Sequence, residues 1–425
     1  MAERIRATYL VETADPLGEA AATMAGEQSS GTFVDLPGET DELQARHGAR
    51  VEELVELDAG SEPALPGATA PDPGGSRPEY RQAEVTLSFP MENVGTSLPN
   101  LRATVAGNLF ELAPFSGLRL LDMDLPDAFA EENPGPQFGI EGTRDLLDVH
   151  DRPIVGTIIK PNVGLTPAET AETVAEVVDA GVDFVKDDEL IADPPYSPVE
   201  ERVEAVMDVI HDHERATGEK VMYACNITGG VSEMIERHDA VKEAGGNCVM
   251  VSINSVGISG LLALRRHADL PIHAHRNGWG ALSRHPLLGF DYAAFHQFFR
   301  LAGADHMHVN GIRNKFTESD ASVVQSARAC QEPIADDSDR VVPVFSSGQW
   351  AGQAPDTYRA LGNADLMYLA GGGILGHPDG PAAGVAHLKQ GWEAAMQGIP
   401  LEEYAEDHEE LRAAIDYYGP VGAGR

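Results

Sequence analysis

Basic residues are scarce in this chain of 425 residues, where 30 Lys and Arg stand against 68 Asp and Glu and the net charge is −38. Only six of the basic residues are lysines. A surface this acidic, with no basic cluster to offset it, repels nucleic acids and anionic membranes, so we expect neither as a partner. The composition is typical of a protein adapted to a high-salt cytosol, and drift in composition is the alternative.

Cysteine is also rare, with copies only at Cys225, Cys248 and Cys330. An odd number at wide spacing argues against a disulfide framework, and the apolar runs around Cys225 and Cys248 predict buried side chains.

The first residues lack the apolar stretch of a signal peptide. No apolar run approaches the ~18 residues that a membrane span requires. We therefore expect a soluble, cytoplasmic protein.

The pattern of the chain changes near residue 140. Before it, the alternating apolar residues of IRATYLVE and AEVTLSFP predict strands, and the acidic stretch 41–57 predicts a helix. The Pro- and Gly-rich stretch 60–77 predicts a flexible surface loop. We assign residues 1–138 to a small α+β domain of ferredoxin-like type and residues 139–425 to a catalytic domain.

Short apolar runs alternate with helical segments after residue 150, which predicts an α/β fold. The expected strands cover residues 154–160, 184–189, 221–227, 248–253, 271–276, 306–312, 341–347 and 366–370. Segments such as PAETAETVAEVVDAG between them have helical periodicity. A series of β–α units of this number and length predicts a TIM (β/α)8 barrel, whose sites form at the carboxyl ends of the strands.

The motif KDDE at the end of the second barrel strand predicts a metal site. Alternate residues of a strand share a face, so Lys186 and Asp188 are expected to point the same way, and Glu189 follows where the chain turns. Two carboxylates provide the hard oxygen ligands that Mg²⁺ prefers. A buried lysine beside two acids also forms an ordinary ion pair, and the motif alone does not separate the two interpretations.

Other strand ends carry reactive or anion-binding residues. Lys160, at the end of the first barrel strand, suits an acid/base or a Schiff-base former, although a lysine at a barrel rim often only extends into water. In HAHR, His273 and His275 alternate onto one face, and Arg276 adds a cation suited to phosphate. The stretches SSGQW and LAGGGILGHP follow the last two strands, where barrels commonly bind phosphate through backbone N–H groups.

Taken together, these strings resemble the RuBisCO large-subunit superfamily over nearly the whole chain. GTIIKPNVGL, FVKDDE, HAHR and DHMHVNGIRNK stand in the order of that family's motifs. The resemblance implies that Lys186 is carbamylated by CO2 and that the carbamate, Asp188 and Glu189 bind Mg²⁺. It implies that Lys160 moves protons at the reacting carbons and that His275 lies near them.

The resemblance also implies a phosphate-binding set and a dimer. The implied phosphate contacts are Arg276, His308, Ser347, Gly348, Gly371 and Gly372, and Lys315 occupies the position of the mobile-loop lysine. In GEQSSGTF and AGNLF, the residues Glu27, Thr32 and Asn108 match family residues that reach the site of the partner subunit. A homodimer, or a higher assembly of dimers, is therefore implied.

The chain departs from the carboxylating members at several positions. Asn162 replaces the second lysine of their KPK motif, Ile158 a threonine, and Trp279 a histidine, while Val309-Asn310 and Gly348-Gln349 replace a serine–glycine and a glycine pair. HRNGWG and SSGQWAGQAP are most similar to the RuBisCO-like proteins of apiose breakdown. The resemblance therefore implies a lyase that decarboxylates or cleaves 3-oxo-isoapionate 4-phosphate through a metal-bound enediolate.

Three other functions stay open at this point. Carboxylation of ribulose 1,5-bisphosphate is opposed by Asn162 and Trp279. The enolase of methionine salvage, which acts on 2,3-diketo-5-methylthiopentyl 1-phosphate, is opposed by the retained Lys315 and Glu27, because a simple enolisation has no carboxylate to hold. A non-enzymatic binding protein is opposed by the complete KDDE motif.

Overall fold

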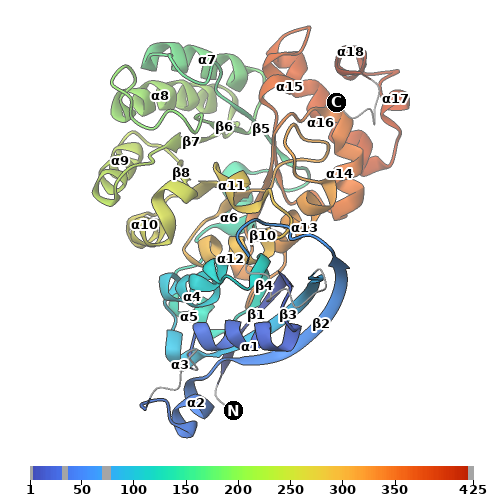
Figure 1. The fold of residues 1–425 in the computed structure, drawn as a ribbon. Helices are drawn as coiled ribbons and strands as arrows, with labels where there is room; N and C mark the ends of the chain where they lie inside the picture. The colour runs from blue at the N-terminus through green and yellow to red at the C-terminus, as the bar shows by residue number, and fades with distance from the viewer. Residues whose placement is uncertain (1–2, 31–36, 69–77, 420–425) are drawn as a thin grey trace. The chain divides into compact units, whose positions relative to one another are not determined.

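A computed structural model describes residues 3–30, 37–68 and 78–419 of the chain. The chain forms two compact units (Figure 1). The first comprises Met1–Asn133 together with Gly278–Leu301, and the second comprises Pro134–Asn277 and Ala302–Arg425. The sequence pattern gave no indication that the segment Gly278–Leu301 belongs to the first unit.

The first unit is built on a five-stranded mixed sheet with the order β10-β4-β1-β3-β2. Its strands are β1 (Arg4–Thr13), β2 (Arg50–Gly60), β3 (Tyr80–Pro90), β4 (Phe115–Asp124) and β10 (Leu288–Phe290). Strand β10 pairs in parallel with β4, and the other pairs are antiparallel. Alternation buries one face of β1, at Ile5, Ala7, Tyr9 and Val11. An α+β domain is confirmed.

Short helices complete the first unit. They are α1 (Leu17–Glu27), α2 (Asp41–His47), α3 (Met91–Val94), α4 (Leu98–Ala106), η1 (Asn108–Glu111), α5 (Ala128–Glu132), α11 (Trp279–Ser283) and α12 (Tyr292–Leu301). The prediction of one helix over residues 41–57 is wrong beyond His47, because the chain then enters β2. Part of the predicted loop 60–77 lies outside the described residues.

The second unit contains a closed barrel of parallel strands in the order β11-β12-β13-β5-β6-β7-β8-β9. They are β5 (Ile154–Ile158), β6 (Phe184–Lys186), β7 (Met222–Asn226), β8 (Cys248–Ser252), β9 (Ile272–His275), β11 (His306–His308), β12 (Val342–Phe345) and β13 (Met367–Leu369). The TIM barrel and its eight expected strands are confirmed. Each strand ends one to four residues before its predicted end.

Helices surround the barrel (Figure 1). They are α6 (Gly139–Leu147), α7 (Pro167–Asp179), α8 (Val199–Thr217), α9 (Val231–Glu243), α10 (Ile253–His267), α13 (Asp320–Gln331), α14 (Ala354–Leu361), α15 (Gly371–Leu375), α16 (Pro381–Gln397), α17 (Leu401–Tyr404) and α18 (Glu409–Tyr418), with 3-10 turns η2 (Asp337–Asp339) and η3 (Ala351–Gln353). Helix α7 begins as its sequence predicts, with Thr166 and Glu169 capping each other and Pro167 in the first turn.

The barrel interior is apolar at its amino-terminal end. Ile154, Phe184, Met222 and Cys248 are among the residues that fill it. All three cysteines are free and buried, as predicted for Cys225 and Cys248. Burial raises the pKa of the Cys225 thiol to about 12, so this thiol is chemically inert. None of the described helices has the length and apolar character needed to cross a membrane.

Candidate active site

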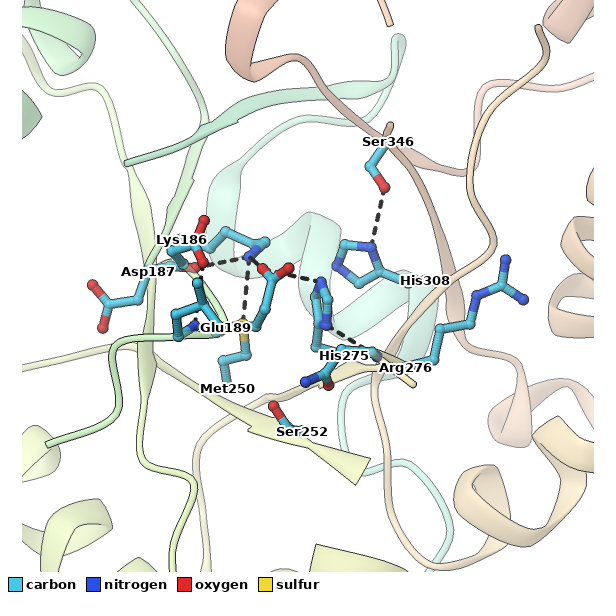
Figure 2. A network of polar contacts seen from close by, with 12 residues as sticks. Lys186, Asp187, Glu189, Met250, Ser252, His275, Arg276, His308 and Ser346 are labelled. Atoms are coloured by element: carbon cyan, nitrogen blue, oxygen red, sulfur yellow. Dashed lines mark hydrogen bonds and ion pairs between the residues drawn. The ribbon is translucent and has the colours of Figure 1, made fainter. Parts of the chain in front are cut away.

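Lys186 is the last residue of β6 and lies inside the barrel with only 1% of its side chain exposed. Its Nζ atom donates to the carbonyl oxygen of Asp187 at 2.8 Å and lies 3.7 Å from Oε2 of Glu189 (Figure 2). Burial lowers the pKa of Lys186 against the opposing effect of Glu189, Asp188 and Asp187. Burial therefore shifts the amine toward its neutral form, which is the nucleophilic form.

Asp188 and Glu189 flank this amine from the loop after β6. Asp188 is buried, and its carboxylate accepts from Nζ of Lys160 at 2.8 Å. Oε2 of Glu189 lies 3.5 Å from Nε2 of His275. Burial acts to raise the pKa of Glu189, but His275 and Lys186 outweigh it and keep the pKa below its usual value. Two carboxylate side chains thus lie beside the amine of Lys186.

Asp187 does not share this arrangement, and Figure 2 shows its side chain pointing away from the Lys186 amine. Its carboxylate accepts from Nε of Arg202 at 3.2 Å, from the hydroxyl of Tyr223 at 2.6 Å and from the backbone N–H of Asn226 at 2.9 Å. The buried ion pair that the KDDE motif could have formed is therefore made by Asp187, which holds the motif to α8 and β7.

Histidines from β9 and β11 line the next part of the barrel. Nε2 of His273 lies 2.8 Å from Nε2 of His308, and the rings of His275 and His308 are 4.4 Å apart. The expectation that His273 and His275 lie on one face is confirmed. Burial lowers the pKa of His275 to about 4 and the pKa values of His273 and His308 well below the usual range. The imidazoles are therefore neutral near pH 7.

Nδ1 of His308 lies 3.2 Å from the hydroxyl oxygen of Ser346 (Figure 2). Since both Nε2 atoms of the His273–His308 pair face each other, one ring donates and the other accepts. The contact with Ser346 then orients the remaining nitrogen of His308. His308 is thus held by its neighbours in one orientation at the carboxyl end of β11.

Arg276 is already paired with a carboxylate of the protein. Its Nη2 donates to Oε2 of Glu318 at 2.6 Å, and Glu318 also accepts from Nδ2 of Asn310 at 2.6 Å and from the hydroxyl of Ser322 at 3.0 Å. The hydroxyl of Ser347 donates to Oδ1 of Asn310 at 3.0 Å. Two of the residues expected to receive a phosphate, Arg276 and Ser347, therefore belong to a network centred on Glu318, a residue that no sequence motif identified.

Lys160 lies beside Asp188 but is not withdrawn from water, since 39% of its side chain is exposed. Its ammonium donates to Asp188 at 2.8 Å and to Oδ1 of Asn162 at 2.7 Å. A methyl group built on Gly371 would lie 3.8 Å from Cε of Lys160, so the start of α15 closes over this side chain. Asn162, which replaces a lysine of the carboxylases, thus helps to hold the ammonium of Lys160.

The remaining predicted residues take up more scattered positions. The backbone N–H of Lys315 donates to the carbonyl of Ser347 at 3.2 Å, but its exposed ammonium lies 5.3 Å from the centre of the Phe316 ring. Gly348 follows β12 with a φ of 88°, and Gly371 and Gly372 begin α15 after β13. The structure therefore places the side chain of Lys315 outside the polar cluster of the barrel.

Two of the substituted positions have structural roles. The amide of the buried Gln349 donates to the carbonyl of Ile312 at 3.2 Å and accepts from the hydroxyl of Tyr368 at 3.1 Å. Trp279 packs against Phe295 with 4.6 Å between ring centres.

The residues expected to reach a partner's site are described only in part. Nδ2 of Asn108 lies 3.5 Å from Oε1 of Glu27 in the first unit, while Thr32 is outside the described residues.

The donor set fits a hard divalent cation once Lys186 is carbamylated. Addition of CO2 to the neutral Nζ forms a C–N bond, releases the amine proton and replaces the buried amine by a carboxylate-like group. Asp188 and Glu189 then supply two further oxygen donors at the same strand end. The lowered pKa of Lys186 is the observation that favours this reaction, because only the unprotonated amine adds CO2.

Comparison with known proteins gives matches over nearly the whole chain. Residues 5–129 match the N-terminal domain of the ribulose bisphosphate carboxylase large chain, and residues 139–418 match its catalytic domain. A 3-oxo-isoapionate-4-phosphate transcarboxylase/hydrolase of Xanthobacter autotrophicus is 53% identical over 98% of this chain and 100% of its own length. A 3-oxo-isoapionate-4-phosphate decarboxylase of Rhizobium rhizogenes is 48% identical over 97% of both chains.

A solved structure shows the same fold. The crystal structure of a rubisco-like protein from Burkholderia fungorum superposes with a TM-score of 0.91 and 47% identity, and the match covers 97% of this chain and 99% of the other.

Proposed function

Since the chain belongs to the ribulose bisphosphate carboxylase large-chain family, we propose that it is a magnesium-dependent carbon–carbon lyase acting on 3-oxo-isoapionate 4-phosphate. The observation that carries the proposal is the buried amine of Lys186 between Asp188 and Glu189, in a chain whose relatives of 53% and 48% identity are named for that substrate. The proposal includes a carbamate on Lys186 as the third metal ligand.

A bound Mg²⁺ would supply Lewis-acid polarisation of the substrate's oxygen atoms. The protein's own groups have separate tasks around the reacting carbons. Loss of CO2 from a 3-oxo acid breaks the bond to the carboxylate and leaves the electron pair on the adjacent carbon, conjugated with the ketone. The ammonium of Lys160, held by Asp188 and Asn162, is positioned to return a proton to that carbon.

The phosphate of the substrate would be received at the network around Glu318. Arg276 contacts Glu318 directly and Ser347 joins it through Asn310, while His308 and the Gly348, Gly371 and Gly372 amides belong to the neighbouring strand ends. Arg276 supplies a fixed positive charge, and Ser347 a hydroxyl donor. Lys315 lies on the loop after β11 and would have to turn from Phe316 to neutralise the carboxylate of the substrate.

Ribulose 1,5-bisphosphate carboxylation is the less suitable reaction for this chain. Asn162 contributes an amide oxygen to Lys160 where the carboxylase motif has a second lysine, so one cation is missing beside the reacting carbons. Methionine-salvage enolisation is likewise less suitable, since it leaves Lys315 without a carboxylate to hold.

The direct test is an assay of the purified protein on three substrates: 3-oxo-isoapionate 4-phosphate, ribulose 1,5-bisphosphate and 2,3-diketo-5-methylthiopentyl 1-phosphate. We expect release of CO2, or hydrolytic cleavage, with the first alone, and a dependence on Mg²⁺ and on preincubation with CO2. Lys186→Ala should abolish the activity, whereas Lys220→Ala, at an exposed lysine outside the site, should retain it. Incorporation of labelled CO2 into phosphoglycerate would refute the assignment.

We also propose that the active form is a homodimer in which Glu27, Thr32 and Asn108 complete the site of the partner subunit. Mixing Glu27→Gln protein with Lys186→Ala protein under exchange conditions should restore about half of the activity in each mixed dimer, because one of its two sites is then intact, and about a quarter of the total activity when equal amounts exchange at random. A fully active monomer on a sizing column would contradict the shared site.

A further inference from the structure

A second cluster of metal-ligating side chains lies outside the barrel, on α9 and α10. His238 and Asp239 are on α9, and His267 is the last residue of α10. One nitrogen of each imidazole and one carboxylate oxygen of Asp239 lie within 4.8 Å of one another. Figure 1 shows α9 and α10 as neighbouring helices on the outside of the barrel. None of these residues takes part in the site described above.

The distances from the two imidazole nitrogens to Asp239 are slightly shorter than those within a metal's ligand set. Nδ1 of His238 and Nε2 of His267 lie 3.0 and 2.7 Å from the same carboxylate oxygen, Oδ1 of Asp239. In a tetrahedral site with metal–ligand bonds of ~2.0–2.1 Å, neighbouring ligand atoms are about 3.3 Å apart. A small outward shift of the partly exposed Asp239 and His267 would reach that spacing.

The other nitrogen of His238 is a further observation that a bound metal would account for. Nε2 of His238 belongs to a side chain that is 1% exposed, and it has no hydrogen-bond partner among the described residues. It faces the carboxylate of Asp269, whose Oδ1 is 3.6 Å away and which Lys242 holds in place.

This arrangement is poorly matched to a neutral His238 without a ligand. If Nδ1 carries the proton that is donated to Asp239, the lone pair of Nε2 faces a second carboxylate, which is repulsive. A metal ion on Nδ1 removes the repulsion, because the proton then belongs on Nε2 and points toward Asp269. A proton on both nitrogens is the other arrangement that removes it, and the metal titration below separates the two. A carboxylate that accepts from the distal nitrogen of a metal-bound histidine is a common outer contact in metal sites.

We propose that His238, Asp239 and His267 bind a divalent transition-metal ion of the Zn²⁺ type, with Asp269 as the outer carboxylate. The two imidazoles and one carboxylate leave a fourth position for water, on the side where Asp239 and His267 are exposed. The ion would join the carboxyl end of α10 to α9. The proposal is independent of the reaction proposed above, because none of its residues contacts that site.

Cobalt provides the test, because Co²⁺ bound to nitrogen and oxygen ligands in a tetrahedron absorbs visible light. The titration uses full-length Asp188→Asn/Glu189→Gln protein in CO2-depleted buffer, so that the carbamate site cannot contribute. We expect one equivalent of Co²⁺ to bind with tetrahedral absorption and to be displaced by Zn²⁺. His267→Gln or Asp239→Asn, added to this background, should weaken binding at least tenfold without changing the circular dichroism of the metal-free protein.

His213→Gln is the matched control. His213 lies 3.7 Å from Asp179 and 3.6 Å from Glu219, but it offers a single imidazole to those carboxylates. Its substitution should leave Co²⁺ affinity unchanged. The proposal is overturned if the background protein binds no Co²⁺ with tetrahedral absorption, or if the His267→Gln protein binds it as tightly. Equal weakening by His213→Gln would overturn it as well, since binding would then be to scattered surface imidazoles.

Discussion

The guanidinium of Arg276 is held by a carboxylate of the protein itself. Glu318 accepts from Arg276, Asn310 and Ser322, and under the proposed function it occupies the place of a substrate phosphate beside Arg276. A phosphate and this carboxylate compete for the same donors, because charge-assisted bonds to one anion exclude the other. The affinity for a phosphorylated substrate thus depends on how readily Glu318 leaves.

Glu318→Gln should lower the KM for the phosphorylated substrate and the inhibition constant of inorganic phosphate by about tenfold. The reason is that the neutral amide gives up a charge-assisted contact that is worth more than an ordinary hydrogen bond by ~1–1.5 kcal/mol. Glu402→Gln, at an exposed position of α17, is the control. A KM that rises in the Glu318→Gln protein would show that Glu318 instead holds Arg276 in place for the substrate.

The buried histidines predict how stability depends on pH. His306, deep in the barrel, contacts the hydroxyl of Thr143, and burial lowers its pKa from 6.5 to about 3. Between these values the unfolded chain binds a proton that the folded chain does not bind. The free energy of unfolding therefore falls as the pH drops below 6.5, by up to ~1.4 kcal/mol per pH unit for each such group.

His306→Gln should reduce that slope between pH 6 and 4 relative to the unmodified protein, whatever its effect on stability at pH 7. Urea unfolding at a series of pH values measures it. His150→Gln, which removes an exposed histidine, should leave the slope unchanged. Identical slopes in the His306→Gln and unmodified proteins would mean that His306 is protonated in the fold.

At the scale of elements, the ion pair between Asp187 and Arg202 joins β6 to α8. Both side chains are at most 2% exposed, so loss of the cation leaves a charge buried without its partner. Arg202→Met should lower the free energy of unfolding by ~3–5 kcal/mol.

Arg215→Met on the same helix is the matched comparison. Arg215 pairs with Asp212, but their side chains are 74% and 72% exposed, so we expect a change within ~0.5 kcal/mol. Equilibrium urea unfolding of the two variants measures both changes in the free energy of unfolding. Similar stabilities would show that the Asp187–Arg202 pair contributes no more than a surface pair.

For the whole molecule, the net charge of −38 predicts a strong response to salt. The Debye length shrinks from ~10 Å at 0.1 M to ~3 Å at 1 M salt, so the carboxylates repel one another less. We expect the melting temperature to rise between roughly 0.1 and 2 M KCl. A melting temperature that stays flat or falls over this range would refute adaptation to high salt.

The sequence determined the architecture because the relevant signals are local. Short apolar runs between amphipathic helices specify the eight barrel strands, and their order in the chain brings the strand-end residues to one rim. The motif KDDE was sufficient to predict that Lys186, Asp188 and Glu189 lie together at one strand end. Residues 50–57 were misassigned because their apolar spacing also fits a helix, and only pairing with β3 makes them an edge strand.

Tertiary structure decided which partner each charged group has. Asp187 and Asp188 are the same residue type at adjacent positions, yet Asp187 binds Arg202 of α8 and Asp188 binds Lys160, two residues after the end of β5. Glu318 reaches Arg276 across 42 positions of chain, and His238 reaches His267 from another helix. These contacts are missing from every local pattern, because hydrogen bonds and ion pairs depend on distances that only the closed barrel and its packed helices set.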